Sequence, residues 1–100
     1  MSVYSAEYID AATLTVTTGS TSQQVFAKNI HRKALLIQNP VDASESLFVN
    51  FLSDAGATNG SIELGSGGTL NMPQGMVLSM QKVSVTAATT GHRFIAKEGV

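Results

Sequence analysis

The sequence of 100 residues contains no cysteine, no tryptophan and only two prolines, and only 13% of its residues are charged. Without cysteine the chain can form neither a disulfide nor a cysteine-based zinc site, and it has no thiol nucleophile. The longest apolar runs, ALLI (34–37) and LFV (47–49), are far shorter than the roughly 20 residues of a membrane-spanning helix, so we expect no membrane association. The first ten residues lack the basic and apolar regions of a signal peptide, and we expect synthesis in a cytoplasm.

The chain also has little charge of either sign, with a formal net charge of -1 at pH 7. Lys28, Arg32 and Lys33 form the only basic cluster, and no aromatic stacking pattern accompanies it. Proteins that bind the phosphate backbone need clustered lysine and arginine, often with aromatic groups that stack on bases. Nucleic acid is therefore not expected as a partner.

Residues that could carry chemistry are scarce. His31 and His92 each precede an arginine, but neither has a second metal ligand close in sequence, so both are interpreted as partly exposed histidines at strand edges. No Gly-x-Ser-x-Gly motif is present, and the glycine-rich stretch 65–68 lies between two short apolar runs instead of before a helix. We predict no catalytic residue, no cofactor and no metal site, and hence a protein that is not an enzyme.

Two acidic stretches leave one alternative open. The segments 42–45 and 54–59 offer side-chain oxygens, but their spacing is unlike that of a dense calcium loop. Both are better interpreted as turns in which Asp or Asn bonds its own backbone. A weakly bound cation remains an alternative for these loops.

What the sequence does contain is a regular series of short apolar runs separated by Gly, Pro, Asn and Asp. This pattern predicts an all-β fold, a single antiparallel β-sandwich or jelly-roll-like domain of roughly eight short strands with minimal helix, over residues 12–100. The expected strand segments are 13–17, 23–28, 34–39, 46–51, 61–64, 69–72, 76–80, 82–86 and 92–97.

The alternation within these segments predicts which side chains face inward. In Ala34–Gln38 four apolar residues run together, which indicates a strand covered on both faces. The stretch Ser53–Ser61 is expected to be an exposed loop, and Gly65–Gly68 the end of a tight hairpin. The predicted core consists of Leu14, Val16, Leu35, Ile37, Leu47, Val49, Phe51, Ile62, Leu64, Leu70, Leu78, Val83, Val85 and Phe94.

Residues 1–11 lack clear periodicity and are predicted to form an N-terminal arm. Their large apolar residues, Tyr4, Tyr8 and Ile9, are the candidate partner-binding residues, because tyrosine suits interfaces that are apolar on one side and wet on the other. The alternative is a frayed terminus whose tyrosines lie on the domain itself.

Five stretches of the chain resemble small β-sandwich structural proteins of tailed bacteriophages. They are RKALLIQNP (32–40), LFVNF (47–51), ATNGSIEL (57–64), Gly67-Gly68 and TGHRFIAKEG (90–99), so the resemblance extends over about residues 30–100. In size, and in the lack of cysteine and of catalytic residues, the chain is most similar to the head decoration (cement) proteins of this class.

The resemblance implies a non-enzymatic virion protein on the capsid exterior that contacts the major capsid protein or another virion protein and stabilises neighbouring capsomers. It also implies a homotrimer, since such proteins are often trimers at three-fold positions. Two other classes stay open. One is a tail, fibre or head–tail joining module, and the other is a carbohydrate-binding β-sandwich, although the absence of tryptophan counts against stacking on a sugar.

Overall fold

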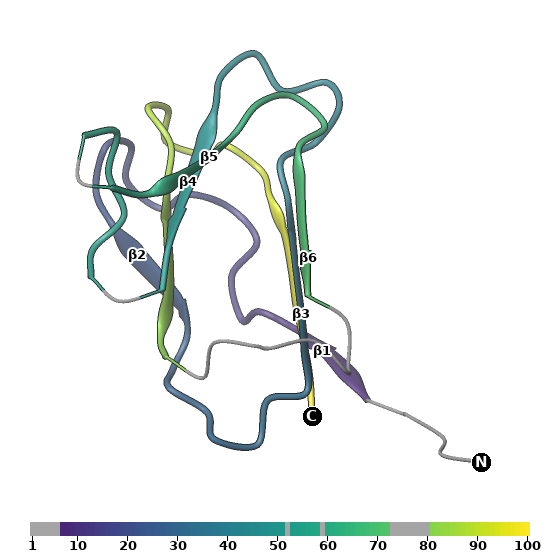
Figure 1. Cartoon of the computed structure of the whole chain (residues 1–100). Coiled ribbons are helices and arrows are strands. Elements are labelled where there is room, and N and C mark those ends of the chain that lie inside the picture. Colours follow the sequence, from purple (N-terminus) through teal and green to yellow (C-terminus); the bar gives the residue numbers. More distant parts are fainter. Residues whose placement is uncertain (1–6, 52, 59, 73–80) are drawn as a thin grey trace.

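A computed structural model describes residues 7–51, 53–58, 60–72 and 81–100 of the chain. These residues form eight short strands and no helix, arranged as two antiparallel four-stranded sheets packed face to face (Figure 1). The predicted all-β sandwich is therefore confirmed.

Within each of the two sheets, strands that are distant in the sequence lie next to each other. The first sheet runs β1 (Tyr8–Asp10), β8 (Ile95–Gly99), β3 (Ala34–Gln38) and β6 (Thr69–Met72). The second runs β2 (Gln23–Phe26), β7 (Val83–Thr86), β4 (Leu47–Asn50) and β5 (Ile62–Leu64). The last strand of the chain thus lies between the first and third, and the seventh lies between the second and fourth, which is the connectivity of a double-sheet jelly roll.

The core lies between the sheets and is built from the inward-facing residues of both. β-Branched and leucine side chains alternate inward along the central strands, as expected for sheets with one buried face. Of the predicted core residues, the following are buried: Val16, Leu35, Ile37, Leu47, Val49, Leu64, Val83, Val85 and Phe94. Phe51 and Leu70 are partly buried against this cluster, whereas Leu78 lies outside the described residues.

Two core predictions were wrong. Leu14 and Ile62 each keep 38% of their surface exposed. The segment around Leu14 is not a regular strand, because it pairs with the segment before β8 through a single bridge between Thr15 and Arg93, and the alternation therefore does not hold. Ile62 begins β5, an edge strand of three residues whose one neighbour is β4, so its side chain is covered on one side only.

The prediction that β3 is covered on both faces holds only in part. Leu35 and Ile37 point into the core and are fully buried, and Ala34 is also buried. Leu36, which points away from the core, stays partly exposed. The extra apolar residue in this strand is thus on the outer face of the sheet.

One connection differs from its predicted form. Gly65–Gly68 does form a turn, closed by Gly68 N–H donating to the Gly65 carbonyl at 2.8 Å, but it joins β5 to β6 in the other sheet and is therefore not a hairpin. The segment after β4 is mostly exposed, as predicted, although one residue packs on the domain. Its Ala55 is buried, and the Ala55 N–H donates to the Ser22 hydroxyl at 2.9 Å.

Residues 8–10 of the predicted arm form the edge strand β1. Tyr8, Ile9 and Asp10 pair with Gly99, Glu98 and Lys97 of β8, and the next residue, Ala11, is buried. The apolar pattern missed this strand because both of its large apolar side chains are about half exposed.

A buried ion pair lies near the end of the sandwich at which the chain termini are found. Arg32 Nε is 2.7 Å from Glu98 Oε2, and both side chains are almost fully excluded from solvent. The Arg32 guanidinium also donates to the backbone carbonyls of Gln81 and Ala27. All of these Arg32 contacts lie within the domain. The basic cluster identified in the sequence is therefore reduced to Lys28 and Lys33.

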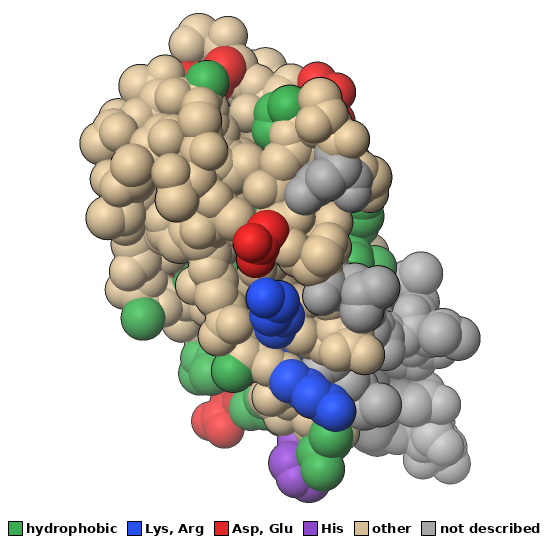
Figure 2. Space-filling view, turned by 90° about the vertical axis from the view of Figure 1, so that its left-hand side faces the viewer, with side chains coloured by type: hydrophobic (Ala, Val, Ile, Leu, Met, Phe, Trp, Pro, Cys, Tyr) green, Lys and Arg blue, Asp and Glu red, His purple; other side chains and the backbone are tan. Residues whose placement is uncertain are grey.

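The side of the molecule on which β2 and β4 lie carries mostly uncharged polar groups. Figure 2 shows this side, whose upper part is covered largely by backbone and uncharged polar side chains, whereas most of its basic, histidine and apolar side chains lie toward the lower end. Serine and threonine supply 21 of the 100 residues, which accounts for this polar surface of low charge.

Two loops approach each other so closely at Gly19 that the position requires glycine. A Cβ atom at Gly19 would lie 2.3 Å from the Ala88 carbonyl oxygen, so no other residue fits there. Gly19 N–H donates to the Thr90 hydroxyl at 2.9 Å, and Ser20 N–H donates to the Ala87 carbonyl at 2.7 Å. The segment before β2 is thereby fixed against the loop between β7 and β8.

Candidate functional site: a polar pocket at one end of the sandwich

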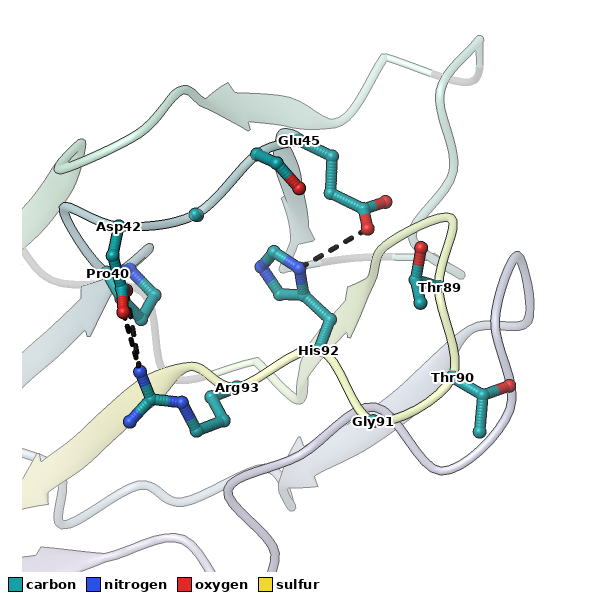
Figure 3. Close-up of a pocket in the computed structure, with 10 residues that line it drawn as sticks. Pro40, Asp42, Glu45, Thr89, Thr90, Gly91, His92 and Arg93 are labelled. Carbon is teal, nitrogen blue, oxygen red and sulfur yellow. Dashed lines mark hydrogen bonds and ion pairs between the residues drawn. The ribbon is translucent and has the colours of Figure 1, made fainter.

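A pocket of about 370 Å³ lies between the β3–β4 and β7–β8 connections (Figure 3). Both connections lie at the end of the sandwich away from β1 and the C-terminus (Figure 1). The lining residues are Pro40, Asp42, Ala43, Ser44, Glu45, Thr89, Thr90, Gly91, His92 and Arg93.

Short turns give the two loops their shape. Pro40 follows β3 and cannot donate to a strand ladder, and its carbonyl accepts a hydrogen bond from Ala43 N–H at 3.1 Å. On the other side, His92 N–H donates to the Thr89 carbonyl at 3.2 Å. Gly91 within this turn has a φ of +86°, a conformation that glycine adopts without a steric penalty.

Asn39, directly before Pro40, connects the pocket walls to the rest of the domain. Its side chain is fully buried, and its amide nitrogen donates to the backbone carbonyls of Glu45 at 2.9 Å and Leu64 at 3.0 Å. Its backbone N–H donates to the Gly68 carbonyl at 2.9 Å. One residue therefore ties the β3–β4 connection to the β5–β6 turn.

The same asparagine orients His92 from the other loop. His92 Nε2 lies 2.7 Å from Asn39 Oδ1, and the His92 side chain is only 7% exposed. Because the Asn39 amide nitrogen donates to two carbonyls, its oxygen must face the imidazole, which assigns the proton to Nε2. Nδ1 is then directed at the Glu45 carboxylate, with 3.6 Å between Nδ1 and Oε1.

Glu45 is held as a carboxylate at the inner side of the pocket. The Thr89 hydroxyl, the Ala88 N–H at 2.8 Å from Oε2 and the adjacent His92 ring together lower the pKa of Glu45 below its ordinary value. These groups stabilise the charged form more than partial burial opposes it. In Figure 3 the Glu45 carboxylate points toward the imidazole and Thr89 lies beside it.

The outer rim carries a second charged pair. Arg93 Nη2 lies 3.2 Å from Asp42 Oδ2 and 3.4 Å from Oδ1. About 70% of each side chain is exposed, with values of 68% and 71%. An exposed pair of this kind contributes little to stability, so its groups can exchange partners at low cost.

The pocket therefore presents hydrogen-bond donors and acceptors in close proximity. Its lining carries the carboxylates of Asp42 and Glu45, the Arg93 guanidinium and the hydroxyl-bearing residues Ser44 and Thr89. No cluster of three or more potential metal-ligating side chains exists among the described residues.

The site differs from the sequence predictions. The interpretation of His92 as a partly exposed strand-edge residue was wrong, since its ring is buried and bonded to Asn39. Tyr8 and Ile9 lie on β1, 49% and 52% exposed, near the end of the sandwich opposite the pocket (Figure 1). Tyr4 lies outside the described residues.

Sequence reasoning missed the pocket because its members are far apart in the chain. His92 and Asn39 are separated by 53 positions, and the contact depends on which strands become neighbours. The one local signal is the Asn39-Pro40 pair directly after an apolar strand, which predicted the strand end but not a buried hydrogen-bonding role.

In comparisons with known proteins, no family model, no curated protein and no solved structure matches this chain. Within the described part of the chain, no helix is long and apolar enough to cross a bilayer.

Proposed function

We propose that the protein is a non-enzymatic structural component of a phage virion, a decoration (cement) protein that binds the capsid exterior and stabilises neighbouring capsomers. Its partner is the major capsid protein or an adjacent virion protein. The observation that carries the proposal is the strand edge of β1, where Tyr8 and Ile9 are about half exposed.

Strand β1 presents large apolar groups where they are available to a partner. Tyr8 and Ile9 are about half exposed, and among the described strands β1 has a neighbour on one side only. A free strand edge next to exposed aromatic and aliphatic groups is a common place for one chain to add to another. Such an edge suits a protein that is used on the surface of a larger assembly.

The residues that carry the resemblance to phage virion proteins support this reading by their positions. They lie in β3, β4, β5 and β8 and in the segments directly before or after these strands. Their role in this chain is to build the sandwich and its end loops, as expected of a structural protein. The jelly-roll connectivity is compatible with the proposal, because that architecture recurs in viral capsid domains, and it also occurs in lectins.

A homotrimer is the proposed assembly state. A domain of this size without disulfides buries a limited part of its surface on folding, and further burial between copies would stabilise it. Closed cyclic association protects strand edges, and three-fold symmetry matches the three-fold positions of a capsid.

The test is to add purified protein back to heads that lack it and to measure occupancy. Replacing both Tyr8 and Ile9 by serine should lower binding at least tenfold, because each loses apolar contact area at the interface. The matched control is Val41→Ser, which removes an apolar side chain that is 78% exposed in the β3–β4 connection. This control should bind like the unchanged protein.

Equal occupancy of heads by the double variant and the unchanged protein would place the contact elsewhere and overturn the role of β1. Circular dichroism of both variants shows whether the sandwich is intact, so that loss of binding is not confused with loss of folding. Binding through apolar groups should also weaken little when salt is raised, unlike binding through surface charges.

A further inference from the structure

We propose that the polar pocket formed by the β3–β4 and β7–β8 connections is a binding site for a neutral polyhydroxylated ligand, a sugar residue. The chemistry of the pocket lining and the preformed shape of the pocket carry this inference. The pocket lies at the opposite end of the sandwich from β1, so a partner at one end leaves the other accessible (Figure 1).

The charged groups around the pocket disfavour an anion and are already paired within the protein. An anion such as phosphate would meet the carboxylates of Asp42 and Glu45, of which Asp42 is paired with the Arg93 guanidinium and Glu45 accepts from the Ala88 N–H. A sugar hydroxyl both donates and accepts, so it can bond to a carboxylate and to a guanidinium in the same site. At the rim, the Asp42 carboxylate offers an acceptor and the Arg93 guanidinium offers a donor. The two groups are 3.2 Å apart, a spacing that two neighbouring hydroxyls can match.

The walls of the pocket are held in place before any ligand binds. Asn39 bonds to Glu45, Leu64 and His92, and the Glu45 carboxylate is held by Ala88 N–H. Ordering a flexible loop on binding lowers affinity, and this cost is reduced when the loop is already fixed. A volume of about 370 Å³ is in the range of small-ligand pockets.

The lining has no aromatic platform, so binding depends on hydrogen bonds and on contact with the ring of Pro40. We therefore expect millimolar affinity for a single site. Many copies on one particle would convert weak sites into strong attachment to a polysaccharide. This multivalent use rests on the proposed virion role, whereas binding by the isolated protein does not.

The experiment is an NMR titration of the full ¹⁵N-labelled chain with the methyl glycosides of glucose, galactose and mannose. At least one glycoside should cause saturable shifts at the amides of Ala43, Glu45, Thr89, Gly91 and His92. Inorganic phosphate and methylamine serve as anionic and cationic probes and should cause smaller, non-saturating shifts at these positions.

A matched pair of double variants makes the test specific. Asp42→Ala with Arg93→Ala removes the rim pair and should weaken glycoside binding about tenfold. Asp10→Ala with Lys97→Ala removes another exposed pair, with a 2.7 Å contact between β1 and β8, and should leave binding unchanged.

The inference is overturned if none of the three glycosides shifts these amides, if phosphate or methylamine binds there more tightly, or if both double variants behave alike. Since the titration uses the isolated chain, a negative result leaves the virion proposal standing. Conversely, failure to bind heads would leave the sugar site standing.

Discussion

At the residue scale, Asn39 is the side chain on which the pocket depends most. Asn39→Ala removes the buried side chain that hydrogen-bonds to the Glu45 and Leu64 carbonyls and to His92 Nε2. We expect the free energy of unfolding to fall by about 3 kcal/mol, the scale of losing several buried hydrogen bonds. Urea denaturation measures this change.

The control for that substitution is Asn71→Ala on the exposed face of β6. An exposed substitution of this kind should change the free energy of unfolding by no more than about 0.5 kcal/mol. Equal effects of the two substitutions would show that the hydrogen bonds of Asn39 do not stabilise the fold.

Glu45 gives the site a defined pH dependence. Its pKa is lowered in the folded protein from an ordinary value of 4.5, so the folded state is stabilised by the carboxylate form. This stabilisation is fully present above the unfolded pKa and is lost as pH falls through the lower, folded pKa. Glu45→Gln lacks the titrating group and cannot show this loss.

We therefore expect the difference in free energy of unfolding between the unchanged protein and Glu45→Gln to be constant at neutral and mildly acidic pH. At pH values below the ordinary pKa of 4.5 this difference should shrink, because the unchanged protein loses stability relative to Glu45→Gln. Urea denaturation at a series of pH values measures it. A difference that does not vary with pH, or that grows on acidification, contradicts the assignment.

At the scale of elements, the buried Arg32–Glu98 pair joins the β2–β3 connection to β8. Removing one partner leaves a buried charge uncompensated, so Glu98→Gln should cost about 3 kcal/mol of unfolding free energy. Replacing both, as Arg32→Met with Glu98→Leu, should recover most of this loss because apolar groups can occupy the same volume. Thermal unfolding measures the stability of the single and the double variant. A double variant no more stable than Glu98→Gln would refute the argument.

Phe94, directly before β8, and Phe51, directly after β4, differ in how deeply they are buried. Phe94 is almost fully buried, whereas Phe51 is only partly covered. Phe94→Ala should cost about 3–5 kcal/mol and yield little soluble protein. Phe51→Ala should be measurably milder; if its loss in stability equals that of Phe94→Ala, the packing around β4 is misjudged.

How well the strands could be predicted depended on how regular each one was. The segments around β3, β4, β6 and β7 are bounded by clear turn residues, and their predicted ranges agree with the structure to within about two residues. β1 was missed because both of its large apolar side chains are half exposed. The 13–17 segment was overpredicted because alternation alone cannot show that its partner offers a single bridge.

At the scale of the whole molecule, the sequence predicted the class of fold but not the pocket. Local periodicity determines which residues face inward, and this suffices for a sandwich. The pocket depends on two loops 50 positions apart meeting at one end, where buried Asn39 and His92 bond to each other. Periodicity carries no information about such a contact.

The two ends of the sandwich carry different groups, with exposed Tyr8 and Ile9 on β1 at one end and the polar pocket at the other. The central claim is that the β1 edge attaches many copies of this protein to a phage head. The most direct test is quantitative mass spectrometry of purified particles, with the major capsid protein as the internal standard. The account predicts hundreds of copies per particle, in a fixed ratio to the capsid protein. A copy number equal to a single ring would identify a tail or connector component, and absence from the particle would contradict the virion role altogether.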